Sequence, residues 1–154
     1  MYSYIRKAKY HETDQMGIIH HANYIKWMEE ARIAMLDQLG FPYRRFEETG
    51  YVSPVLAVTC DYKKSVKFDD EVKIVVGLKS FNRLKFTLQY DMYNLSEGEV
   101  LSTRGTTTHC FLNREGRPVV MDREMKEFYE KMKEMQGFQS ANRIIDEVEN
   151  DDSK

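Results

Sequence analysis

Residues able to take part in a reaction are concentrated between positions 10 and 32, which read YHETDQMGIIHHANYIKWMEEAR. Asp14 lies in a short polar run that ends at Gly17, and two adjacent histidines, His20 and His21, precede a strongly helical segment. A carboxylate in such a loop can act as a nucleophile or as a general base. This stretch is therefore the candidate site of a reaction.

Other reactive side chains form weaker patterns. His20 and His21 are adjacent, so their side chains point in different directions, and neither His-x3-His nor HExxH occurs. Cys60 and Cys110 lie far apart within apolar runs, without CxxC spacing, and are interpreted as reduced core residues. The sequence therefore predicts neither a metal site nor a cysteine nucleophile.

Length and composition restrict the class of protein. The 154 residues fit one domain, and 23 basic against 25 acidic residues give a formal net charge of -2. No overall positive field exists to drive binding to nucleic acid or to an anionic membrane. The N-terminus lacks the apolar core of a signal peptide, and no apolar run approaches the ~18 residues of a membrane span. We expect a cytoplasmic protein without a transmembrane segment.

Two predicted elements flank the candidate site. Residues 2–10 alternate loosely between apolar and charged side chains, which predicts a first strand. Residues 22–39 carry apolar side chains at steps of three and four, and Gly40 followed by Phe41 and Pro42 ends the pattern, which predicts a long helix. Because the apolar stripe is wide and holds the only Trp, we expect this helix to pack against a sheet.

Beyond a polar connection at residues 44–50, the period of the apolar residues changes to two. The alternating stretches lie at residues 56–63, 72–78, 84–92 and 100–112. Short clusters of turn-forming residues separate them, and a parallel pairing would need a crossover of a dozen or more residues. We therefore expect a largely antiparallel meander.

A second helix is predicted after residue 118. Asp122 is a plausible N-cap, and Gly137 is expected to end the helix. Its apolar stripe consists of Met125, Phe128, Met132 and Met135. Residues 1–138 are expected to form one α+β domain, and residues 139–154 a polar, acidic tail in which only Ile144, Ile145 and Val148 form an apolar patch.

One set of residues resembles a known family. The set consists of Tyr10, Asp14, Gly17, His21, Asn23, Tyr24, Glu30, Ala31 and Arg32. Together with the order of the elements, it resembles the hot-dog-fold thioesterases of the 4-hydroxybenzoyl-CoA thioesterase type, and most closely the YbgC-like acyl-CoA thioesterases. The resemblance extends over about residues 2–135. It implies a five-stranded antiparallel sheet wrapped around a long central helix, plus a C-terminal helix.

The resemblance also implies a site and a substrate. Asp14 would be the catalytic carboxylate of a thioester hydrolase, with His21 and Tyr10 as assistants. Coenzyme A carries phosphates, which basic side chains bind. The implied substrate-binding residues are Tyr24, Arg83, Lys64 and Lys85. No cofactor is expected beyond the coenzyme A of the substrate, and the family implies a homo-oligomer, a dimer of dimers forming a homotetramer, with the acyl site between subunits.

Physical chemistry supports the same residues independently. Thioester hydrolysis requires a group that attacks the carbonyl or activates water, and donors for the oxyanion. Asp14 can supply the first, as nucleophile or as general base, and backbone N–H groups around His21 can supply the second. Thiolate leaves readily, so no strong general acid is obligatory, although His21 can protonate it or orient the water.

Alternative interpretations remain open at this stage. Asp14 can cap a turn, His21 can be a structural residue of the helix start, and Tyr10 can be a strand-end aromatic. Hot-dog dehydratases act on acyl carrier protein thioesters with a His before the helix and a Glu further along it, which the loop position of Asp14 fits poorly. A non-catalytic module that binds acyl thioesters on the same fold is the third alternative.

Overall fold

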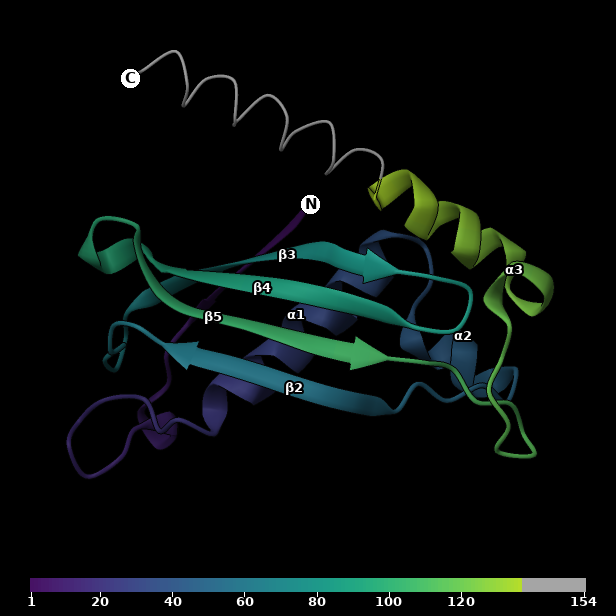
Figure 1. Cartoon of the computed structure of the whole chain (residues 1–154). Coiled ribbons are helices and arrows are strands. Elements are labelled where there is room, and N and C mark those ends of the chain that lie inside the picture. The colour runs from purple at the N-terminus through teal and green to yellow at the C-terminus, as the bar shows by residue number, and fades with distance from the viewer. Residues whose placement is uncertain (137–154) are drawn as a thin grey trace, which may run out of the picture.

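The computed structural model describes residues 1–136, which form a sheet with helices on one face and at one end (Figure 1). In chain order the elements are β1 (Tyr2–Lys7), the 3-10 turn η1 (Tyr10–Glu12), α1 (Asn23–Gln38), α2 (Tyr43–Glu48), β2 (Val55–Tyr62), β3 (Glu71–Phe81), β4 (Phe86–Asn94), η2 (Leu95–Glu97), β5 (Val100–His109) and α3 (Met121–Glu124). Residues 126–136 are also helical. No helix in this part of the chain is long and apolar enough to cross a membrane.

The five strands form one antiparallel sheet in the order β1-β3-β4-β5-β2. The predicted, largely antiparallel meander is confirmed for β3, β4 and β5, whereas β2 lies beside β5 and not beside β3. The first strand pairs with β3, with Arg6 opposite Val72, and so occupies that edge. On the other side of the sheet, β2 pairs with β5, and Cys60 of β2 lies opposite Gly105. This order leaves β2 at the edge of the sheet.

The predicted packing of the long helix against the sheet is confirmed. The buried residues of α1 are Tyr24, Trp27, Met28, Ala31, Met35 and Leu36. They face a layer of buried strand residues: Val72, Ile74, Val76, Leu78, Leu88, Tyr90 and Met92. Each large apolar side chain buried in this layer contributes roughly 1.5–3 kcal/mol, so this interface is the main stabilising contact of the fold.

Two predictions at the other end of the sheet were wrong in detail. The connection at residues 44–50 contains α2, because Phe46 is buried against the rings of Phe111 and Phe128, a contact that no local pattern shows. Asp122 is not an N-cap, because Val120 holds that position and Asp122 lies inside α3.

The apolar stripe of the second helix is confirmed, since Met125, Phe128 and Met132 are buried and Met135 is partly buried. The predicted stop at Gly137 and the predicted tail at residues 139–154 lie outside the described residues.

Gly105 of β5 lies against the side chain of Met28 from α1. A methyl group on its Cα would collide with the side chain of Met28 and lie 2.7 Å from the carbonyl oxygen of Thr59. The absence of a side chain at this position therefore allows Met28 to reach the strand backbone.

We expect Gly105→Ala to lower the free energy of unfolding by about 1–3 kcal/mol, because an added methyl group overpacks this contact. Urea denaturation measures the change. In the Met28→Ala background the same substitution should cost less, since the side chain it collides with is gone. Equal costs in both backgrounds would contradict the proposed contact.

Candidate active site

A pocket of about 240 Å³ lies where the start of α1 meets the end of β2. Its walls come from the loop before α1, from α1 itself and from the segment that follows β2. The lining residues are Asp14, Met16, Ile18, Ile19, His21, Tyr24, Tyr62, Lys63, Lys64 and Ser65. The structure thus brings together four of the predicted site residues, Asp14, His21, Tyr24 and Lys64.

A tight turn holds Asp14 at the pocket. Its N–H donates to the carbonyl oxygen of Ile18 at 2.8 Å, its carbonyl oxygen accepts from Gly17 N–H at 3.1 Å, and its Oδ1 accepts from Met16 N–H at 2.8 Å. Gly17 has φ 78°, a conformation that side chains disfavour. The turn-capping interpretation is therefore correct for Oδ1. Among residues 1–136, Oδ2 has no hydrogen-bond partner, which leaves it available to a ligand.

The segment that leads into α1 has a free backbone donor in His21, another residue that lines the pocket. The ring Nδ1 of His20 accepts from Ala22 N–H at 3.1 Å, and the carbonyl oxygen of His20 accepts from Asn23 N–H at 3.0 Å. Within the described part of the chain, the N–H of His21 donates to no acceptor. Because the N-terminal end of a helix carries partial positive charge, this N–H is suited to bind an oxyanion.

Tyr62 fixes the helix start from the side of β2. Its hydroxyl donates to the carbonyl oxygen of His21 at 2.9 Å, and its ring lies edge-on to the rings of His21 and Tyr24. Partial burial, with the neighbouring Cys60 thiol, raises the pKa of Tyr62 to about 12, so the hydroxyl keeps its proton. The sequence showed Tyr62 only as one residue of an alternating strand, and nothing in that pattern indicated a site.

Tyr24 and Tyr10 have different surroundings. Tyr24 is 3% exposed, and burial raises the pKa of its phenol. Tyr10 is 76% exposed, lies outside the pocket and contacts the edge of the Phe68 ring. The geometry of the single chain therefore gives Tyr10 no contact with the site, and its assisting role stays a prediction.

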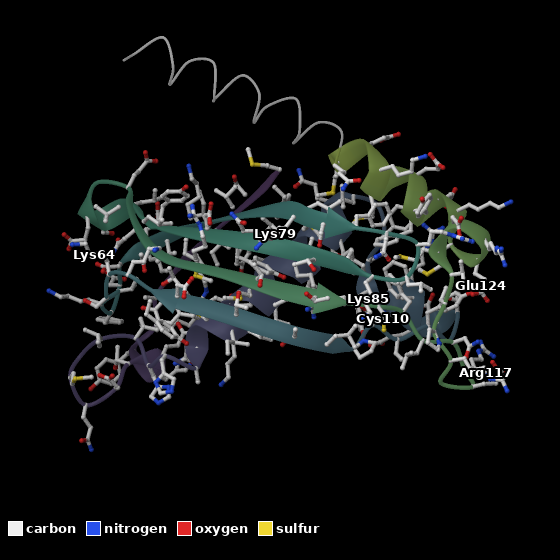
Figure 2. All side chains as sticks on the ribbon, viewed as in Figure 1. Lys64, Lys79, Lys85, Cys110, Arg117 and Glu124 are labelled. Atoms are coloured by element: carbon white, nitrogen blue, oxygen red, sulfur yellow. The ribbon has the colours of Figure 1, made fainter. Side chains whose placement is uncertain are left out.

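Arg83 and Lys85 lie at the opposite end of the sheet from the pocket. Tyr62 pairs with Thr103 of β5. Phe86, which directly follows the hairpin that holds Arg83 and Lys85, pairs with His109 of the same strand. The distance along β5 is roughly 20 Å at about 3.3 Å per residue. Figure 2 shows Lys64 and Lys85 at these two ends.

Within one chain, Arg83 is occupied by an ion pair. Its Nε lies 2.9 Å from Oδ2 of Asp122 in α3. The two basic residues of the hairpin are therefore not brought together with Asp14 inside a single subunit.

A buried carboxylate that the sequence did not indicate anchors the loop. Glu12 is 5% exposed. Its Oε1 accepts from Arg6 Nη1 and from Lys9 N–H, both at 2.8 Å, and its Oε2 accepts from the Trp27 indole N–H at 2.7 Å. Burial acts to raise the pKa of Glu12, but the hydrogen bonds from Arg6, Trp27 and Lys9 outweigh it and lower that pKa.

Comparison with known proteins gives consistent matches over most of the chain. Residues 9–135 match the model of the thioesterase-like superfamily. The chain is 35% identical over 131 residues to a putative acyl-CoA thioesterase, YneP, of Bacillus subtilis, which covers 82% of this chain and 94% of that protein. Its identity to the acyl-CoA thioesterase YbgC of Haemophilus influenzae is 23% over 133 residues, which covers 86% and 96%.

A solved structure shares both the fold and part of the sequence. The crystal structure of a DHNA-CoA thioesterase from Staphylococcus aureus superposes with a TM-score of 0.86 at 31% identity, over 92% of this chain and 94% of that chain.

The lowered pKa of Glu12 predicts a pH-dependent contribution to stability. The contribution should be complete above the unfolded carboxyl pKa of about 4.3 and should be lost as pH falls through the lower folded value. We expect the difference in unfolding free energy between the native chain and Glu12→Gln, measured in urea between pH 7 and pH 3, to narrow at acid pH. A constant difference would show that the charge of Glu12 contributes nothing.

Proposed function

Because the chain belongs to the thioesterase-like superfamily and is a thioester hydrolase, we propose that Asp14 and the free N–H of His21 together hydrolyse an acyl-CoA thioester. The observation that carries this proposal is that two residues lining one pocket, Asp14 and His21, contribute a carboxylate oxygen and a backbone N–H that both lack partners within residues 1–136. The sequence-based resemblance to hot-dog thioesterases is confirmed for family, fold and reaction class.

The proposed reaction places the thioester carbonyl oxygen at the N–H of His21. Oδ2 of Asp14 then either attacks the carbonyl carbon or removes a proton from the water that attacks it. Negative charge develops on the carbonyl oxygen, where the N–H and the positive end of α1 stabilise it. When the C–S bond breaks on the water route, the acyl group is released directly as the carboxylic acid. On the route of direct attack, breaking the C–S bond leaves a mixed anhydride between the acyl group and Asp14, and a water molecule then hydrolyses it to the free acid and the Asp14 carboxylate. On both routes the thiolate takes a proton from solvent or from His21.

The remaining residues of the pocket have proposed roles in binding. Tyr24 and Tyr62 supply aromatic walls for the acyl group, and Tyr62 also holds the carbonyl of His21. Lys63 and Lys64 lie exposed at the rim, where they suit the phosphates of coenzyme A. An acyl carrier protein presents the same pantetheine arm, so both carriers are candidates.

The dehydratase alternative requires a helix carboxylate that faces the site. Glu30 instead lies 2.8 Å from Arg6 and accepts a hydrogen bond from the Tyr4 hydroxyl. Glu29 lines a separate groove between α1 and β1. This placement of both glutamates favours hydrolysis over elimination.

We further propose a homotetramer, a dimer of dimers, in which the β2 edges of two subunits pair. Along β2, Cys60 alone is half-buried and every other residue is exposed, including Val55, Leu56, Val58 and Tyr62 at 41–49%. An edge strand leaves backbone N–H and C=O groups unpaired, and a second copy of the strand would satisfy them.

Antiparallel pairing of two β2 strands has a consequence for the site. It would set the Tyr62 end of one strand beside the Val55 end of the other. The hairpin of the partner subunit would then approach the pocket, and its Arg83 and Lys85 could bind the phosphates of the substrate.

The two free cysteines support a reducing, cytoplasmic location.

We expect Asp14→Asn to lower kcat by well over ~10²-fold with the fold intact, because the amide can still accept from Met16 N–H but cannot act as nucleophile or base. Thiol release from a panel of acyl-CoA and acyl carrier protein thioesters, with aryl groups included, measures this. Asp69→Asn is the control, since Asp69 is an exposed carboxylate outside the pocket. Retained turnover in Asp14→Asn would exclude the assignment.

A charge on the β2 edge should break the proposed assembly. Val58→Lys is expected to yield smaller species in analytical ultracentrifugation and to reduce turnover in parallel. Ile5→Lys is the matched control, because Ile5 is 54% exposed on the opposite edge strand, against 41% for Val58. An unchanged sedimentation coefficient for Val58→Lys would show that the chains do not associate through β2.

A further inference from the structure

Glu12 is bound by three segments of the chain at once. The donors to its carboxylate come from Arg6 in β1, from Lys9 in the turn that follows β1, and from Trp27 in α1. The side chains of Glu12 and Arg6 are each 6% exposed. Every neighbour that hydrogen-bonds this carboxylate is a donor, so the position requires a group that only accepts. An ionised carboxylate meets this requirement, and an amide does not.

The backbone of the same residue joins the two halves of the site. The carbonyl oxygen of Glu12 accepts from the N–H of His20 at 2.9 Å and from Nδ2 of Asn23 at 2.8 Å. His20 directly precedes the free N–H of His21, and Asn23 is the first residue of α1. Asp14 follows Glu12 by two residues. The separation between Asp14 and the helix start therefore depends on where the peptide of Glu12 lies.

The side chain of Glu12 determines the position of that peptide. The hydrogen bonds that hold the carboxylate from three directions restrain the turn η1 and so keep its carbonyl directed at the helix start. Loss of these bonds would let η1 move and would shift Asp14 relative to His21. Misplacement of a reacting group by about 1 Å can cost on the order of 10²-fold in rate.

We propose that Glu12 is a positioning residue for the hydrolytic reaction, which sets the separation between Oδ2 of Asp14 and the N–H of His21. This inference rests on the proposed function, because it gives Glu12 no contact with the substrate. The side chain of Glu12 holds the turn that precedes Asp14, and the backbone carbonyl of Glu12 holds the residues around His21 at the start of α1.

Glu30 provides a matched control for a purely structural role. Its carboxylate pairs with the same guanidinium of Arg6 at 2.8 Å and accepts from the Tyr4 hydroxyl at 3.3 Å. It has no hydrogen bond to the loop between η1 and α1. Glu12→Gln and Glu30→Gln therefore both weaken the ion pairing of Arg6, but only Glu12→Gln disturbs the loop.

The test compares kcat, KM and the unfolding midpoint of these two variants on one acyl-CoA, assayed well below the midpoint of either. We expect Glu12→Gln to lower kcat by about 10-fold to 10²-fold with KM within ~3-fold, because the pocket walls remain while the reacting groups separate. Glu30→Gln should keep kcat within ~2-fold. Equal kcat values for the two variants, or a rise in KM with kcat unchanged, would overturn the proposal.

A second variant, Asn23→Ala, tests the same proposal if Glu12→Gln does not fold. Asn23→Ala removes one of the two hydrogen bonds to the Glu12 carbonyl, the one that comes from α1, and leaves the bond from the His20 N–H and the buried ion pair intact. We expect kcat to fall by about 10-fold at unchanged KM, and retained kcat would overturn the proposal.

Asp14→Asn separates this inference from the proposed function. If Asp14→Asn keeps its turnover, the proposed function fails and the role of Glu12 fails with it. If Asp14→Asn is inactive while Glu12→Gln and Asn23→Ala retain full kcat, only the positioning role is wrong.

Discussion

Burial of the apolar face of α1 against the sheet fixes the positions of most other elements of the fold. Trp27, Met28 and Ala31 have no exposed surface, and the inner side of the sheet supplies their contacts. Gly105 lets the side chain of Met28 reach the strand backbone of β5. With the helix fixed at this depth, its first turn reaches the end of β2, where the Tyr62 hydroxyl binds the carbonyl of His21. The location of the pocket is thus a consequence of helix packing.

The segment before α1 contains two carboxylates, Glu12 and Asp14, whose hydrogen bonding differs. Glu12 is buried, and both of its carboxylate oxygens accept hydrogen bonds, from donors in β1, the turn and α1. Asp14 uses one oxygen for its own turn and keeps the other free. A carboxylate with both oxygens hydrogen-bonded is held in place, whereas a carboxylate with a free oxygen can accept a proton or attack a carbonyl. The same side-chain chemistry therefore anchors the loop at Glu12 and, in the proposed function, would serve the reaction at Asp14.

The strand order connects the pocket with the surface that remains available for assembly. Since β1 covers the edge of β3, β2 is left with one neighbour and one open side. Tyr62 ends that strand and also lines the pocket. An assembly through β2 would therefore cover one side of the site, and it would explain how basic residues roughly 20 Å away along the sheet could serve the same substrate.

The sequence by itself determined the elements whose residues show which face is buried. The period of 3.6 predicted α1 and the period of two predicted the strands, and both predictions are confirmed because side-chain direction follows directly from the local backbone. The polar run before the helix predicted a site at Asp14 and His21, and both residues line the pocket. Only the tertiary structure decided the neighbour of β2, the presence of α2, the contacts of Tyr62 and Glu12, and the distance of Arg83 from the pocket. Each of these depends on a contact between segments far apart in the chain, such as Glu12 with Trp27 or Phe46 with Phe128, and residue periodicity carries no record of such contacts.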